Sequence, residues 1–460
     1  MPKICIVVLS LVIVFCTAGC SKNLPQKELT FTGKLNDEQR RSAEKKPWLA
    51  SKSLRAKAAK ENRAQLYEKL EVKTADFEAE ESLAGLGFIP GTADAYAVYR
   101  DGTAGLILEE GEVIKLDKLS ERIDRVKMGG RAQTVVLGLA SHGSQAAWDS
   151  ADLSRQLTLR PQKTTFGQAR VYDSKPIKHS HYLAAATEGG LLELWSLVSG
   201  NIANSVRFEG VQPREIARNN QGERVIFGTN SGEVRFWSGN DHSHVLYTHA
   251  GPVLEIVNMP RRGLIASSAK DGTLKIYSKR ARRVLYARQF SKALYRIVVS
   301  KNERWVVAIP ATGLPVAFNL DEEGLATSLY KFPVHTIEKA EFLPGDQYML
   351  IKYASKGVFL WDMRGREPVQ GAFVSSIEDG AKDFHIAQKA KISAVLQGER
   401  RVGYWDPEYG RIMGGGLISA RPVERFAISE DGRWLLAGLV GGGLVRMRVM
   451  TGREFTIPVE

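Results

Sequence analysis

The stretch Ala269-Lys270-Asp271-Gly272-Thr273-Leu274-Lys275-Ile276-Tyr277 decides the fold of this chain, because it joins a tight turn to a two-faced strand. Asp271-Gly272 supplies the positive φ that a hairpin turn requires. Residues 273–277 alternate in polarity, which is typical of a strand with one buried face. The apolar residues Leu264-Ile265-Ala266 are expected to form the preceding strand. We therefore predict a hairpin whose second strand ends on a bulky side chain.

The same unit of apolar strand, glycine turn and bulky end residue recurs along most of the chain. Nine such units can be counted, and their end residues, from Ile107 to Met447, lie 40 to 47 positions apart. One small antiparallel sheet cannot bury both of its faces alone, so neighbouring units must stack. We predict that the largest end residues are structural anchors between the stacked sheets: Trp148, Trp195, Trp237, Tyr277, Phe318, Trp361 and Trp405.

A period of about 42 residues with four strands per unit is typical of a propeller blade. The dipeptides Trp148-Asp149, Trp361-Asp362 and Trp405-Asp406 match the one that names the WD40 family. The chain resembles that family over roughly residues 83–460. The resemblance implies an all-β fold, a WD40-like β-propeller over 83–460. The Gly-His signature of the family is mostly absent here.

The number of blades follows less directly from the repeat. The unit that ends at Ile107 is the least typical, and it lacks an aromatic end residue. Closed propellers commonly have up to eight blades, so eight are expected, with seven or nine as alternatives. Phe455-Thr456-Ile457-Pro458-Val459 is a candidate for the strand that closes the ring. His249 and His335 stand at the phase of the family's missing histidine.

The first twenty residues have the pattern of a secretion signal. The apolar run from Ile4 to Phe15 is shorter than the roughly 20 residues that a membrane-spanning helix needs, and it fits a signal-peptide core. Ala18-Gly19-Cys20 at its end resembles the bacterial lipobox. The resemblance implies recognition by a signal peptidase at Ala18 and Gly19, lipid attachment at Cys20, and a signal peptide over 1–19.

The cysteines and the lipobox together predict the compartment. Cys5 and Cys16 leave with the signal peptide, so the mature chain keeps only Cys20 and cannot form a disulfide framework. The lipid on Cys20 would hold the protein on a membrane, facing the periplasm. Ser21, rather than Asp, follows the cysteine, which favours the outer membrane over the inner one. The predicted location is therefore the cell envelope.

A basic tether is expected between the anchor and the propeller, over residues 20–82. Nine basic residues lie between Glu38 and Arg63, in a chain whose formal net charge is +13. The composition of residues 49–72 favours helix, so the tether is predicted to be partly helical. Such a stretch can lie against an anionic surface, although a solvated linker is the simpler interpretation. The envelope location argues against nucleic acid as a partner.

The sequence shows no convergent catalytic set, so we predict no metal, no cofactor and no enzymatic activity. Basic pairs and triplets do occur in the loops between predicted strands. Loops crowd onto the faces of a propeller, so these residues could form a basic rim that recognises an acidic protein or an anionic glycan. They could equally serve solubility alone. The candidate rim residues are Arg261, Arg262, Arg280, Arg282, Arg283, Arg400 and Arg401.

The function favoured by these patterns is a non-enzymatic, lipid-anchored scaffold for protein–protein interactions in a cell-envelope assembly. A rigid disc offers several binding faces, and its exposed strand edges can accept a peptide strand. The alternative is a binder of anionic envelope polymer, either peptidoglycan or lipopolysaccharide. A propeller enzyme is the least favoured function, because it would need convergent polar residues at the ring centre. The sequence does not identify the partner.

Overall fold

The computed structural model describes part of the chain, and everything below refers to that part. The described residues are 67–71 and 81–449, except for 131, 141–143, 153–155, 163–168, 222–223, 240–242, 311–314, 322–325, 329–335, 355–356, 364–369, 374–380 and 407–410. All regular secondary structure within them is β-strand, and these ranges contain no helix that could cross a membrane. The lipobox residues Ala18, Gly19 and Cys20, and the residue His335, lie outside the described residues.

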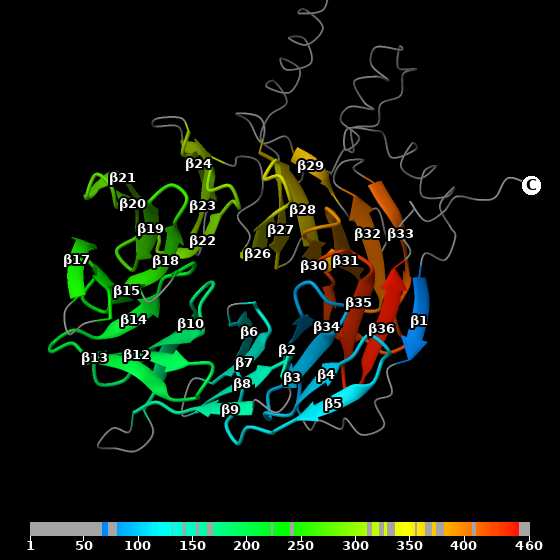
Figure 1. The fold of residues 1–460 in the computed structure, drawn as a ribbon. Coiled ribbons are helices and arrows are strands. Elements are labelled where there is room, and N and C mark those ends of the chain that lie inside the picture. Colours follow the sequence, from blue (N-terminus) through cyan, green and yellow to red (C-terminus); the bar gives the residue numbers. More distant parts are fainter. Residues whose placement is uncertain are drawn as a thin grey trace, which may run out of the picture.

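The strands form four-stranded antiparallel sheets, called blades here and numbered in chain order (Figure 1). Blade 1 comprises β2 (Leu83–Phe88), β3 (Ala95–Tyr99), β4 (Ala104–Ile107) and β5 (Val113–Leu116). Blade 2 comprises β6 (Arg125–Gly129), β7 (Val135–Leu139), β8 (Gln145–Asp149) and β9 (Gln156–Leu159). Blade 3 comprises β10 (Val171–Pro176), β11 (Tyr182–Thr187), β12 (Leu191–Ser196) and β13 (Ile202–Arg207). Blade 4 comprises β14 (Pro213–Ile216), β15 (Val225–Thr229), β16 (Glu233–Trp237) and β17 (Ser243–Thr248).

The remaining sheets repeat the same plan. Blade 5 comprises β18 (Val253–Met259), β19 (Leu264–Ala269), β20 (Thr273–Ser278) and β21 (Arg283–Gln289). Blade 6 comprises β22 (Leu294–Val299), β23 (Trp305–Pro310), β24 (Val316–Asn319) and β25 (Ala326–Ser328). Blade 7 comprises β26 (Ile337–Phe342), β27 (Tyr348–Tyr353), β28 (Gly357–Asp362) and β29 (Gln370–Phe373). Blade 8 comprises β30 (Ala381–Ala387), β31 (Ile392–Gln397), β32 (Arg401–Asp406) and β33 (Arg411–Leu417). Blade 9 comprises β34 (Val423–Ile428), β35 (Trp434–Leu439), β36 (Leu444–Val449) and β1 (Tyr67–Glu71).

The predicted β-propeller is confirmed, and the described residues form nine blades. Nine is the upper end of the predicted range and one more than the eight that were favoured. The unit that ends at Ile107 accounts for the difference. It has no aromatic end residue, yet it forms a complete sheet, and the Ile107 side chain is fully buried. An aliphatic residue is therefore sufficient to fill this position between two sheets.

The ring is closed by a strand from the N-terminal side of the propeller. β1 pairs antiparallel with β36, with Tyr67 opposite Val449 and Glu71 opposite Val445 (Figure 1). The sequence analysis placed these residues in a partly helical tether and offered residues 455–459 as the closing strand. Residues 455–459 lie outside the described residues, whereas 67–71 form a strand. Helix propensity is a weak preference, and the unpaired edge of β36 overrides it by pairing with the backbone of β1.

A buried arginine also joins blade 9 to blade 1. Arg446 on β36 is fully buried, and its guanidinium donates hydrogen bonds to the carbonyl oxygen of Ala93, at 2.7 Å, and to that of Leu108. Both acceptors belong to the turns of blade 1. The guanidinium also lies 4.2 Å from the ring centroid of Trp434 on the neighbouring strand β35. This contact ties the last blade of the chain to the first.

The hydrophobic core is divided among the seams between blades. In one cluster, Leu137 of blade 2 packs with Leu183 and Trp195 of blade 3, and the other clusters likewise join neighbouring sheets. The predicted anchor residues all lie in these clusters or beside them, with at most 4% of their surface exposed: Trp148, Trp195, Trp237, Tyr277, Phe318, Trp361 and Trp405. Apolar stacking between sheets thus holds the ring together.

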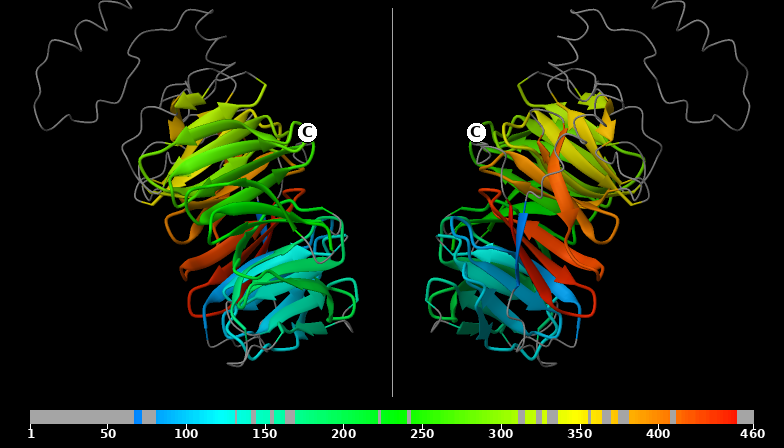
Figure 2. Two further views of the ribbon diagram at one scale, coloured as in Figure 1. Left: turned by 90° about the vertical axis from the view of Figure 1, so that its left-hand side faces the viewer. Right: turned by 90° about the vertical axis from the view of Figure 1, so that its right-hand side faces the viewer.

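The turns alternate between two faces of the disc, because consecutive strands in each blade are antiparallel (Figure 2). Face A carries the turns from the first to the second strand and from the third to the fourth, such as 260–263 and 279–282 in blade 5. Face B carries the turns from the second to the third strand, such as 270–272. Gly232, in a face B turn, has a φ of +91°, and a Cβ there would lie 2.5 Å from the carbonyl oxygen of His249. Only glycine fits that turn without strain.

Candidate functional site

The structure divides the predicted basic rim between the two faces. Arg261 and Arg262 lie in the first turn of blade 5, and Arg280, Arg282 and Arg283 lie in or beside its last turn, so these five share face A. Arg400 and Arg401 belong to the turn between β31 and β32 of blade 8, which lies on face B. The candidate residues therefore cannot contact one compact partner together, because the antiparallel order of the strands separates them.

Four arginines on face A are available for a partner. Arg261, Arg280, Arg282 and Arg283, called the blade 5 cations below, are exposed, and none forms an ion pair with a described acidic residue. Arg262 differs, because it is half-buried and pairs with Asp321 of blade 6.

Charged side chains line the ring centre at one repeated position. The innermost strand of most blades contains a β-bulge, and in blades 3 to 9 the residue that resumes pairing after the bulge is charged. These residues, called the ring charges below, are Asp173, Glu215, Glu255, Arg296, Lys339, Asp383 and Arg425. The sequence analysis missed them. The sequence pattern that could have identified them is an apolar residue two positions before a charged residue, at the start of the innermost strand in blades 3 to 9.

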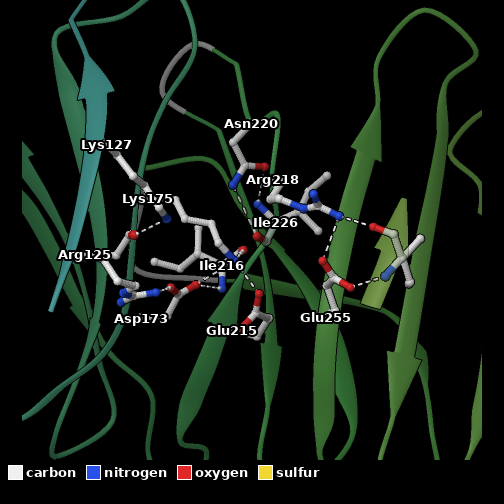
Figure 3. Close-up of polar contacts among 12 residues, drawn as sticks. Arg125, Lys127, Asp173, Lys175, Glu215, Ile216, Arg218, Asn220, Ile226 and Glu255 are labelled. Carbon is white, nitrogen blue, oxygen red and sulfur yellow. Dashed lines mark hydrogen bonds and ion pairs between the residues drawn. The ribbon is translucent and has the colours of Figure 1, made fainter. Parts of the chain in front are cut away.

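Asp173 and its neighbour Lys175 in blade 3 bond to the backbone of blade 4 (Figure 3). Asp173 Oδ2 accepts a hydrogen bond from the Ile216 N–H at 2.9 Å, and Lys175 Nζ donates to the Ile216 carbonyl at 2.5 Å. Lys175 also pairs with Asp173, at 2.8 Å, and with Glu215. The innermost strand is the edge of its sheet, so its outward N–H and C=O groups have no strand partner. Side chains of blade 3 satisfy these groups in blade 4.

Other seams use the same device. Lys339 Nζ of blade 7 donates to the Phe384 carbonyl of blade 8 at 2.5 Å. At the junction of blades 9 and 1, Arg425 Nε donates to the Leu83 carbonyl, and Glu424 Oε1 accepts from the Leu83 N–H, both at 3.0 Å. The ring charges therefore act mainly as cross-links between successive blades.

Burial and neighbouring charges raise the pKa of some groups in this cluster and lower the pKa of others. Burial, followed by repulsion from Asp173, raises the pKa of Glu215 to about 7. Burial lowers the pKa of the Lys127 ammonium to about 8. For Asp173 burial alone would raise the pKa, but attraction to Lys175 and Lys127 and hydrogen bonding outweigh it, so the pKa is lowered. Asp173 and Lys175 thus form the ionised centre of the cluster.

A depression of about 780 Å³ lies at the ring centre on face A. First turns from blades 3 to 8 surround it, and strands β22 and β26 line it where blades 6 and 7 meet. Two of its acidic side chains are engaged by neighbouring backbone, and the third, Glu341, lies 3.8 Å from Lys339 Nζ. Both carboxylate oxygens of Asp346 accept N–H groups, from Lys301 at 3.0 Å and Asn302 at 2.7 Å, and Glu303 accepts the Arg262 N–H at 2.9 Å. The basic lining residues are Lys178, Arg218, Arg261, Arg296 and Lys301.

His249, which the sequence marked as a family remnant, belongs to a network in blades 4 and 5. Its Nε2 lies 2.8 Å from Ser267 Oγ and its Nδ1 lies 2.7 Å from Thr273 Oγ1. Asp271 is 3.7 Å from Nδ1, yet burial lowers the pKa of the imidazole to about 4. The histidine is therefore neutral and structural at pH 7. The described residues contain no group of three or more His, Cys, Asp or Glu that could hold a metal ion.

Nine four-stranded sheets around one centre define the chain as a β-propeller. No protein-family model matches the sequence, and no curated protein does. Among solved structures, a chain of "Crystal Structure of Mitotic Checkpoint Complex" is similar at 12% identity with a TM-score of 0.47, covering 71% of this chain and 86% of that one. The computationally designed Ika8 protein is similar at 15% identity and a TM-score of 0.47, covering 70% and 95%. These likenesses carry no argument about function.

Proposed function

We propose that this protein is a non-enzymatic, lipid-anchored scaffold that binds an acidic protein partner of a cell-envelope assembly through face A. The blade 5 cations carry this proposal, because they are exposed, close in sequence and without an ion pair to a described residue. A patch of one sign steers an oppositely charged partner and selects against others. Propellers commonly act as interaction scaffolds, which fits this use of a face.

The charges at the ring centre support a structural role for that part of the molecule. Asp173 and Lys175 bond to the backbone of the next blade and to each other, and the carboxylates of Asp346 and Glu303 hold turns. Groups that are engaged in this way stabilise the ring. In a scaffold without enzymatic activity, these charges would serve only as cross-links.

The lipid anchor is proposed from Ala18-Gly19-Cys20 and the apolar run before it. It predicts that Cys20→Ala leaves the precursor uncleaved or the protein outside the membrane fraction. Immunoblots of fractionated cells, probed for precursor size and location, measure both effects. Normal processing and normal membrane fractionation of that variant would contradict the anchor.

The interaction role is tested by purification from crosslinked cells, followed by mass spectrometry. Three chains are compared: the unaltered protein, a face A variant with Arg280, Arg282 and Arg283 changed to Gln, and a matched face B variant with Arg400 and Arg401 changed to Gln. We expect a stoichiometric set of envelope proteins with the first and third chains and its loss with the second. Equal recovery from all three would refute a role for face A. Recovery of sacculus fragments alone would favour the anionic-polymer alternative.

A further inference from the structure

Arg296 is the one ring charge that lacks a partner among the described residues. It is half-buried on β22, and no described residue forms a hydrogen bond or ion pair with its side chain. The other ring charges are all engaged. Glu255, for example, pairs with Arg218 at 2.7 Å and accepts the N–H of Ile297. A half-buried guanidinium has given up part of its hydration, so an anion placed against it gains a strong, charge-assisted bond.

Arg296 opens into the depression on face A, where further cations surround it. Lys178, Arg261 and Lys301 are exposed lining residues without an ion pair to any described residue. Arg218 also lines the depression, but its guanidinium is paired with Glu255. These residues come from four blades, so a ligand must extend across the depression to meet more than one of them.

One wall of the depression is apolar. Val298 of β22 and Phe342 of β26 pack in the seam between blades 6 and 7, whereas Val299 is half-buried against the cluster of blades 5 and 6. All three line the depression. At this seam no side-chain hydrogen bond reaches the backbone of Ala340, whereas the corresponding residue Phe384 one blade further on receives one from Lys339. The depression therefore combines cations, apolar side chains and a strand edge without a side-chain cross-link.

We propose that this depression binds an acidic peptide segment of the partner protein, anchored by a carboxylate on Arg296 and packed by an apolar residue against Val299. A volume of about 780 Å³ suits a ligand of several residues and far exceeds a single inorganic ion. The apolar wall favours a peptide with alternating acidic and apolar residues over a purely hydrophilic polyanion. The inference rests on the proposed interaction role of face A, but not on the lipid anchor.

The test uses the purified full chain and fluorescein-labelled ten-residue peptides in which Leu alternates with either Glu or Gln. Fluorescence anisotropy measures binding at low salt and at 0.5 M salt. We expect binding of the Glu peptide but not the Gln peptide, and weakening in salt. Arg296→Gln should weaken binding about tenfold or more, as expected for loss of one charge-assisted bond. Arg400→Gln, a control at an exposed arginine on face B and outside the depression, should change affinity less than twofold.

Because Arg296 has no described partner, Arg296→Gln should also melt at the temperature of the unaltered chain. Arg296→Lys should restore part of the affinity, since it restores charge without the guanidinium fork. The proposal is overturned if the Glu peptide does not bind, or if Arg400→Gln weakens binding as much as Arg296→Gln. It is also overturned, in favour of a non-peptide polyanion, if inorganic tripolyphosphate binds in an Arg296-dependent way and the Glu peptide does not. Loss of peptide binding with retained co-purification of envelope proteins would reject this site and leave the scaffold role standing.

Discussion

Replacing Arg446 by Met should open the junction between blades 9 and 1. The side chain is fully buried, donates to Ala93 and Leu108, and stacks on Trp434. Hydrogen bonds from a charged donor contribute about 1.5–3 kcal/mol each. Met relieves the desolvation of the guanidinium, including its unbonded buried Nε, and this offsets part of the loss. The net destabilisation expected is about 2–4 kcal/mol.

Urea unfolding followed by circular dichroism measures this loss, and amide hydrogen exchange locates it. The first unfolding transition of Arg446→Met should move to lower urea. Exchange should quicken in blades 1 and 9 and stay unchanged in blades 4 and 5, because each blade contacts mainly its neighbours. Arg448→Met is the matched control, since Arg448 lies on the same strand with an exposed side chain. The reasoning is refuted if both variants unfold at the same urea concentration.

Three further predictions concern single residues. Because the pKa of Glu215 is raised, its contribution to the free energy of unfolding is full below pH 4.5 and is lost as pH rises through about 7. The urea midpoint of Glu215→Gln should therefore fall less between pH 5 and 8 than that of the unaltered chain. The lowered pKa of His249 has the opposite effect: its contribution to the free energy of unfolding is full above pH 6.5 and is lost as pH falls through about 4. His249→Asn should therefore lose less stability between pH 7 and 5 than the unaltered chain does. A steeper loss in either variant would contradict the assignment. Gly232→Ala should cost more than about 2 kcal/mol in thermal melts, because a Cβ there meets a backbone oxygen, whereas Gly91→Ala, with open space and a similar φ, should cost about 1 kcal/mol. Equal losses would show that the close approach is unimportant.

The basic residues show which parts of the candidate site could be predicted from the sequence. Arg261 and Arg400 look alike as loop arginines, and only the alternation of turns separates them onto faces A and B. The sequence does not mark Arg296, because its lack of a described partner depends on which side chains the next blade presents. Pairing across seams joins residues about 40 positions apart, so it cannot be inferred from one unit alone.

The chain's own repeat determined the architecture: apolar strands, glycine turns and bulky end residues at a period of about 42 dictate four-stranded sheets that must stack. Local propensity and patterning are sufficient for that, because each unit satisfies its own turns and strand pairs. Only the tertiary structure decided the blade number, the closing strand β1 and the bonds of Arg446. These features join the two ends of the described chain, where the energy comes from satisfying an open sheet edge and buried carbonyl groups rather than from any local preference.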